Sequence, residues 1–171
     1  MKYVVIFLVV FSFLFQSCQQ KNYIYIVRHA EKSTEPSGDV YLSQAGRNRA
    51  HTLKSLLMRK HISYIFSTKT NRTRETAQPL SDEIGIPIKP YTNDTLPKFL
   101  TRCIRLRENM LIVGHSNTII TMLDSFHVTH TAKQFPETDY NAMFILTMKK
   151  GKVANFKETT YGKPGVGSKT N

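Results

Sequence analysis

The sequence predicts an α/β fold, a three-layer α/β/α sandwich with a mostly parallel, mixed central sheet. Short apolar runs alternate with longer segments whose apolar residues recur at helical spacing, which is typical of parallel sheets covered by helices. The runs at 23–27 and 110–113 contain no charged residue, as expected of strands buried on both faces. A short turn joins the last two runs, 142–148 and 153–156, so a closing antiparallel hairpin makes the sheet mixed.

A single domain accounts for the composition. The 171 residues are 40% hydrophobic and 21% charged, which suits one globular domain large enough to bury its own core. We expect this domain to span residues 23–161. The segment 162–171, rich in glycine, is expected to be a flexible tail.

The segment after the first strand is expected to be a helix. Ser43 offers the side-chain acceptor of an N-cap, and apolar residues follow it at helical spacing. Four of them are expected on the buried side of the helix: Ala50, Leu53, Leu56 and Leu57. The apolar run at 62–66 then predicts the second strand.

The next part of the alternation begins with a helix at 71–84, which Gly85 and Pro87 bring to an end. A short third strand begins at 86–88. Its proline places it at an edge of the sheet, because proline cannot donate a ladder hydrogen bond. The remaining elements are a helix at 96–106, the strand at 110–113 and a helix at 118–126.

The first eighteen residues have the pattern of a targeting segment. Lys2 precedes an apolar run at 3–15, and the chain turns polar at Gln19. The run is too short to span a bilayer comfortably but fits the apolar core of a signal peptide. We therefore expect residues 1–17 to be a signal peptide, with an uncleaved anchor helix as the alternative.

Cys18 is expected to carry a lipid anchor. Ser17 stands directly before it, as in a bacterial lipoprotein cleavage site, and several acyl chains would hold the protein at a membrane. Residues 18–22 would then form the lipidated amino terminus and a short tether. We expect a cell-envelope protein, lipid-anchored on the periplasmic or outer-membrane side.

The charge balance favours anionic partners. Lys and Arg number 24 against 12 Asp and Glu, a formal net charge of +12, which suits phosphorylated compounds, nucleic acid or membrane head groups.

The second cysteine of the chain is Cys103, so no intrachain disulfide can form if Cys18 is lipidated. Cys103 has an apolar helical spacing and is expected in the core.

Polar residues follow three of the predicted strands at the point where each ends. Arg28 and His29 come directly after the first strand, Arg72 follows the second, and His115 follows the strand at 110–113. Because the carboxyl ends of parallel strands meet at one edge of a sheet, we expect these side chains to converge. Two imidazoles and two guanidiniums repel one another unless an anion lies between them, so the sequence predicts a phosphate site.

Four motifs around these residues resemble those of the histidine phosphatase superfamily, also called phosphoglycerate mutase-like. They are Val27-Arg28-His29-Ala30-Glu31, Leu42-Ser43-Gln44-Ala45-Gly46, Arg72-Thr73-Arg74-Glu75-Thr76-Ala77 and Val113-Gly114-His115. The motifs stand in the family's order and cover the chain from Tyr23 to about His115. The resemblance implies a phosphoglycerate mutase-like version of the sandwich predicted above.

The resemblance also implies a mechanism, that of a metal-independent phosphatase that needs no cofactor. His29 would be the nucleophile that becomes phosphorylated, and water would hydrolyse the phosphohistidine. Arg28, Arg72 and His115 would bind the phosphate and stabilise its charge during transfer. The substrate would be a phosphomonoester, either a small molecule or a phosphorylated protein.

The acid that protonates the leaving group has two candidates. Asp94 follows the third strand, where the family often has a carboxylate, and we predict it as the acid, with Glu31 beside His29 as the alternative. Asp94 is equally compatible with an N-cap of the helix that begins near Leu96. The chain departs from the family pattern at Ala30, where glycine is more usual.

Other functions have less support. A catalytically weak lipoprotein that binds phosphate or polyanions is the main alternative, favoured by the net charge. No zinc-finger or RNA-binding motif accompanies the basic residues, so we expect no nucleic-acid partner. The histidines lack metal-site spacing, and the short loops at 89–96 and 124–142 do not provide the cap that a mutase needs.

Overall fold

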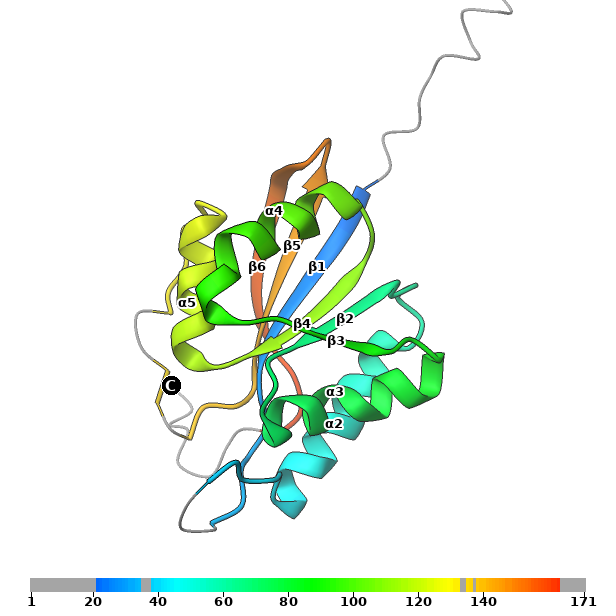
Figure 1. Cartoon of the computed structure of the whole chain (residues 1–171), viewed down its shortest axis with the longest axis vertical. Helices are drawn as coiled ribbons and strands as arrows, with labels where there is room; N and C mark the ends of the chain where they lie inside the picture. Colours follow the sequence, from blue (N-terminus) through cyan, green and yellow to red (C-terminus); the bar gives the residue numbers. More distant parts are fainter. Residues whose placement is uncertain (1–20, 35–37, 133–134, 137, 164–171) are drawn as a thin grey trace, which may run out of the picture.

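The computed structural model describes residues 21–34, 38–132, 135–136 and 138–163, and its centre is a six-stranded sheet (Figure 1). The strands are β1 (Lys21–Arg28), β2 (Tyr64–Ser67), β3 (Ile88–Pro90), β4 (Met110–Gly114), β5 (Ala142–Lys149) and β6 (Lys152–Thr160). Their order is β3-β2-β4-β1-β5-β6. The first four strands are parallel to one another. β5 is antiparallel to β1, and β6 is antiparallel to β5. The sheet is therefore mostly parallel and mixed, as predicted.

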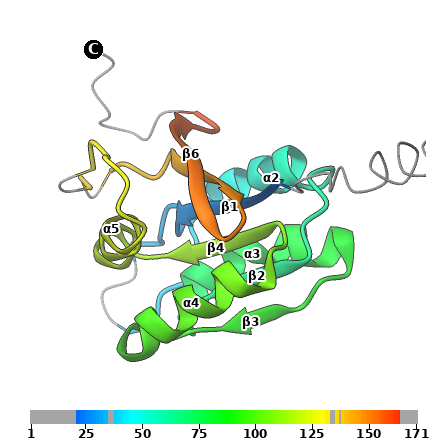
Figure 2. The same cartoon turned by 90° about the horizontal axis from the view of Figure 1, so that it is seen from above.

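Helices cover both faces of the sheet (Figure 2). They are α2 (Gln44–Leu57), α3 (Asn71–Ile84), α4 (Leu96–Leu106) and α5 (Ser116–Ser125), together with a short 3-10 helix, η1 (Asn93–Thr95). Alternate residues of β1 point to opposite faces. Ile24 and Ile26 pack with α4 and α5, whereas Tyr25 and Val27 pack with α2 and α3. The three-layer sandwich is thereby confirmed.

The structure corrects some details of the predicted elements. β2 begins at Tyr64 and not at Ile62, because His61 adopts a positive φ of 50° that belongs to a turn. β3 begins at Ile88, after Pro87. Leu56 is 44% exposed and not part of the buried side of α2, since it lies about 100° around the helix from its buried neighbour Leu57.

Cys103 lies in the core, as predicted. Its side chain is fully buried on α4, and burial raises the pKa of the thiol to about 12. It therefore behaves as a small apolar residue.

The expected signal peptide, the lipidation site Cys18 and most of the tail lie outside the described residues. Within the described part of the chain, no helix is both long enough and apolar enough to cross a bilayer.

Gly46 brings the first turn of α2 against the loop that follows β1. The Gly46 N–H donates to Oγ of the N-cap Ser43 (3.1 Å), and the Ser43 N–H donates to the Glu31 carbonyl (2.9 Å). A Cβ on residue 46 would overlap that same carbonyl oxygen. The close approach therefore requires glycine at position 46, and the Glu31 carbonyl that it meets comes two residues after His29.

We expect Gly46→Ala to lower the free energy of unfolding by about 1–3 kcal/mol, because backbone must move to relieve the overlap. Helix propensity acts in the opposite direction and favours alanine by about 1 kcal/mol. Denaturant unfolding of the purified variant measures the net change in the free energy of unfolding. Ala45→Ser, at the neighbouring exposed position, is the matched control and should stay within about 0.5 kcal/mol of wild type. Wild-type stability of Gly46→Ala would contradict the close packing.

Candidate active site

The carboxyl ends of β1, β2 and β4 lie side by side and carry the predicted site residues. Arg28 pairs with Gly114 in the parallel register of β1 and β4, and β2 flanks β4 on its other side. The His29 N–H donates to the Gly114 carbonyl (2.9 Å). The rings of His29 and His115, which follow β1 and β4, consequently lie with their centroids 5.4 Å apart.

His29 is buried, with 5% of its surface exposed, and is held in one tautomer. Its Nδ1 lies 2.8 Å from the Ala30 carbonyl oxygen, and because a carbonyl can only accept, Nδ1 carries the proton of the neutral ring. Burial, together with the charges of Arg28, His115 and Arg72, lowers the pKa of His29 to about 3, although that hydrogen bond opposes the shift. Near pH 7 the ring is therefore neutral, with its lone pair on Nε2.

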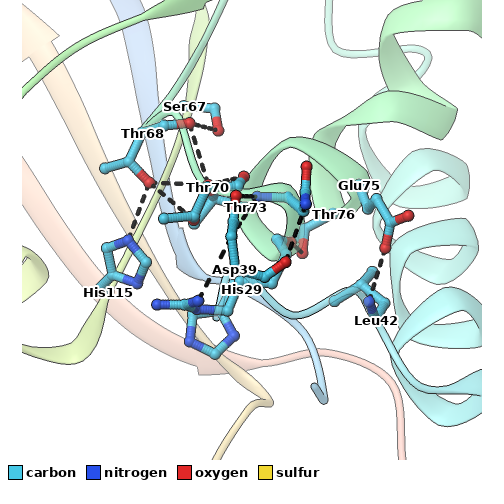
Figure 3. A network of polar contacts seen from close by, with 12 residues as sticks. His29, Asp39, Leu42, Ser67, Thr68, Thr70, Thr73, Glu75, Thr76 and His115 are labelled. Carbon is cyan, nitrogen blue, oxygen red and sulfur yellow. Dashed lines mark hydrogen bonds and ion pairs between the residues drawn. The ribbon is translucent and has the colours of Figure 1, made fainter. Parts of the chain in front are cut away.

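His115 is tied to a chain of threonine hydroxyls at the start of α3 (Figure 3). Its Nε2 lies 3.0 Å from Thr68 Oγ1, and this oxygen lies 2.8 Å from Thr73 Oγ1. Thr73 also donates to the Thr70 carbonyl (2.9 Å). The hydroxyl chain thus links the ring after β4 to the loop after β2.

Arg72 lies in the first turn of α3 and faces a carboxylate from the loop after β1. Its Nη1 lies 3.8 Å from Asp39 Oδ1, and the Asp39 carboxylate also accepts the Asn71 N–H, at 2.8 and 3.0 Å. Asp39 therefore occupies the amino terminus of α3, a position that favours anions. Burial, together with the charges of Arg72 and Arg28, lowers the pKa of His115 to about 4, and the charge of Asp39 opposes the shift.

Arg28 is buried and is held by the segment before β5. Its Nη1 donates to the carbonyls of Pro136 (2.8 Å) and Asp139 (3.1 Å), and its guanidinium lies 4.6 Å from the centroid of the Tyr140 ring. The Tyr140 ring also lies 5.8 Å from that of His29. The structure therefore brings together all four residues predicted to bind phosphate or react with it.

The two candidate acids are placed differently. Glu31 forms a salt bridge with the buried Arg49 (Nη2 to Oε1, 2.6 Å), and Arg49 also donates to the Tyr161 carbonyl (2.8 Å), so Glu31 fastens the loop after β1 to α2 and to the end of β6. Asp94 is exposed in η1. The N-cap of α4 is Thr95, so the N-cap interpretation of Asp94 is wrong, and its role as an acid stays a prediction.

Two further hydrogen bonds connect the sequence motifs with one another (Figure 3). The Ala30 N–H donates to Thr76 Oγ1 (2.9 Å), and Thr76 donates in turn to the Arg72 carbonyl (2.7 Å). The Leu42 N–H donates to the Glu75 carboxylate (2.7 Å). The loop after β1 is thus fastened to α3 at two points.

Sequence reasoning missed several neighbours of the four predicted residues. These are Asp39, Thr68, Thr73 and Tyr140. Thr73 stands inside a motif and Thr68 directly follows β2, so their positions at a strand end and a helix start were a usable signal. Asp39 and Tyr140 come from loops, and nothing in the sequence marks where those loops run.

The cluster combines a neutral imidazole with neighbouring cations. An imidazole with a free lone pair attacks electrophilic phosphorus, and paired guanidiniums bind phosphate oxygens. The imidazole and the guanidiniums together suit an oxyanion between His29 and the arginines. In the described part of the chain, no group of three or more His, Cys, Asp or Glu could hold a metal ion.

We expect the site to make stability depend on pH. The folded-state pKa values of His29 and His115 are about 3 and about 4, below the ordinary value of 6.5. The unfolded state thus binds more protons below pH 6.5, and stability falls as the pH drops from there towards 4. Between pH 7 and 5 we expect a loss of about 2–4 kcal/mol.

Denaturant unfolding in phosphate-free buffer at both pH values measures this loss. The double variant His29→Asn/His115→Asn should show a much smaller difference between the two pH values. An equal difference in wild type and variant would mean that the two histidines are not its source.

Comparison with known proteins agrees with this geometry. Residues 24–95 match the model of the histidine phosphatase superfamily (branch 1), whereas among curated proteins none matches the chain. A crystal structure assigned to the phosphohistidine phosphatase SixA of Agrobacterium tumefaciens has a TM-score of 0.63 at 21% identity, covering 84% of this chain and 99% of that one.

Two further solved structures share the fold. The protein histidine phosphatase SixA in complex with tungstate has a TM-score of 0.65 at 13% identity, over 83% of this chain and 97% of that one. A structure assigned to an α-ribazole-5'-P phosphatase of Escherichia coli K-12 has a TM-score of 0.63 at 12% identity, over 86% of this chain and 99% of that one. Residues 24–95 are thus similar to the histidine phosphatase superfamily, branch 1, and the chain shares the fold of these solved phosphatases.

Proposed function

We propose that this protein is a phosphatase that transfers a phosphoryl group first to His29 and then to water. The observation that carries the proposal is the state of His29, whose Nδ1 is fixed by the Ala30 carbonyl and whose ring is neutral near pH 7. Arg28, Arg72 and His115 surround this ring with donors that suit a phosphate dianion. The match of residues 24–95 to the superfamily model and the fold shared with the SixA structures support the same activity.

In the proposed reaction, Nε2 of His29 forms a bond to phosphorus while the bond between phosphorus and the leaving group breaks. The leaving group takes up a proton. Water then attacks the phosphohistidine, loses a proton and releases inorganic phosphate. Arg28, Arg72 and His115 stabilise the phosphoryl oxygens in both steps, so the reaction as proposed needs no metal.

The substrate that we favour has a leaving group that departs readily, such as the imidazole of a phosphohistidine. Glu31 is engaged by Arg49, and the exposed Asp94 would have to act as the acid for an alkyl ester. One SixA neighbour is assigned as a phosphohistidine phosphatase and the other is described as a protein histidine phosphatase, which supports this class.

A protein that binds phosphate with little catalysis is the second candidate. The placement of the candidate acids favours it, because Glu31 is engaged by Arg49 and Asp94 is exposed. The net charge of +12 also favours the binding of anions. This candidate predicts saturable phosphate binding without hydrolysis.

Hydrolysis of p-nitrophenyl phosphate and of a phosphohistidine peptide by the full-length protein tests the proposal. We expect turnover that EDTA leaves unchanged, because arginine and histidine stabilise the charge, and that vanadate inhibits as a mimic of the transferring phosphoryl group. The tungstate complex of a neighbour supports the choice of an oxyanion inhibitor. Phosphate binding without turnover would favour the second candidate. Activity lost on chelation and restored by Mg²⁺ or Zn²⁺ would contradict a metal-free reaction.

A further inference from the structure

Basic residues gather at the end of the molecule opposite to the candidate active site. Lys21 begins β1 and pairs with Lys149 of β5, and Lys149 pairs with Lys152 of β6. A Cβ on Gly151, in the turn between these strands, would lie 3.5 Å from Ile104 Cγ2 of α4. The start of β1, the β5–β6 turn and the end of α4 therefore lie together, at the top of Figure 1.

We call this surface the basic end. It consists of six exposed cations: Lys21, Arg105, Arg107, Lys149, Lys150 and Lys152. The same three segments, 21–22, 104–109 and 149–152, contain one carboxylate, Glu108, which accepts the Ser63 hydroxyl (2.9 Å). Among the described residues, none of the six cations forms an ion pair.

Ordinary structural roles account for only part of this charge. Arg105 lies in the last turn of α4 and complements the negative end of its helix dipole. The three lysines of the hairpin serve no helix end, and like charges opposite each other on neighbouring strands are unfavourable. Lys149 faces both Lys21 and Lys152 in this way, so an external anionic surface would relieve their repulsion.

The position of the basic end indicates which anion it meets. β1 begins at Lys21 and ends at Arg28, so about 23 Å separates the basic end from the phosphate pocket, at 3.3 Å per residue. The end is therefore not part of the pocket. It includes Lys21, the first residue of β1, and the apolar run at 3–15 and Cys18 come shortly before Lys21 in the sequence.

We propose that the basic end is a docking surface for a bilayer of anionic phospholipids, on which the domain stands with its phosphate pocket facing away. The twelve residues of the three segments include no aromatic side chain, whereas proteins that bind single-stranded nucleic acid stack bases on such side chains. Each basic residue near an anionic membrane increases affinity about fivefold. The effect extends over about 8 Å at physiological ionic strength.

The test compares the binding of full-length protein to vesicles of phosphatidylcholine alone and of an equimolar mixture with phosphatidylglycerol. Attachment through the apolar amino-terminal segment contributes to binding on both kinds of vesicle. It therefore cancels in the ratio of the two partition coefficients. Lys149→Gln/Lys152→Gln should lower that ratio roughly 25-fold, as two factors of about five. The matched control is Lys98→Gln/Lys157→Gln, which removes the same charge from exposed positions outside the basic end, and it should leave the ratio unchanged.

Hydrogen exchange gives a second measurement on the wild-type protein. Segments 104–109 and 149–152 should become protected on the anionic vesicles and not on the neutral ones. An unchanged ratio for Lys149→Gln/Lys152→Gln, or an equal fall for both double variants, would overturn the proposal. So would a loss that appears in binding to a single-stranded oligonucleotide but not in binding to vesicles, because the partner would then be a nucleic acid.

Discussion

Replacing His29 by alanine is expected to lower turnover by about four to six orders of magnitude, as removal of a nucleophile does in other covalent mechanisms. The physical reason is specific to this ring. Its Nδ1 is fixed by the Ala30 carbonyl, and burial together with neighbouring charge keeps Nε2 unprotonated. Water cannot supply a nucleophile held in that position. Steady-state hydrolysis of p-nitrophenyl phosphate measures the loss.

A rapid acid- or base-quench experiment with labelled substrate separates the role of His29 in chemistry from a role in folding. Wild type should carry alkali-stable label on histidine, and His29→Ala should carry none while unfolding cooperatively. His51→Ala, an exposed histidine of α2, is the matched control and should keep wild-type turnover. Turnover close to wild type in His29→Ala would exclude the proposed mechanism.

Arg72→Ala is expected to lower kcat by about 10²–10³-fold, the usual effect of removing one donor that stabilises transition-state charge. Arg72 lies in the first turn of α3 and lowers the pKa of both His29 and His115. Its loss should therefore raise both pKa values and move the acid limb of the kcat/KM profile to higher pH. A pH profile with a substrate of known ionisation measures both effects.

Arg74→Ala is the matched control, since Arg74 lies in the same motif but is exposed. It should leave kcat and the acid limb unchanged. If Arg72→Ala lowered kcat without moving the limb, its charge would not act on the imidazoles as the structure indicates. If both variants lost activity equally, the effect would come from the helix and not from the Arg72 guanidinium.

Most of the fold could be read from local pattern. The burial of β4 over its whole length and the end of α3 at Gly85 follow from residues within a few positions, because hydrophobic periodicity and turn chemistry are local properties. Leu56 shows where this reasoning fails. Its spacing permits a place on the buried side of α2, but the side that α2 buries runs through Ala50, Leu53 and Leu57 and leaves Leu56 exposed.

The family-like motifs were visible in the sequence, but the contacts that explain why these residues occur in them were not. Leu42-Ser43-Gln44-Ala45-Gly46 contains an N-cap at Ser43 and a close approach at Gly46. Glu75 accepts a hydrogen bond from the Leu42 N–H, and Thr76 accepts one from the Ala30 N–H. These contacts join positions more than thirty residues apart, so no local pattern contains them.

The sequence by itself determined the alternation of strands and helices and the convergence of Arg28, His29 and His115, because a residue that directly follows a parallel strand must lie at the carboxyl edge of the sheet. Only the tertiary structure decided which carboxylate lies beside the cations. Asp39 faces Arg72, whereas Glu31 pairs with Arg49 and Asp94 is exposed. The path of a loop depends on the elements against which it packs, and its own residues do not specify that path.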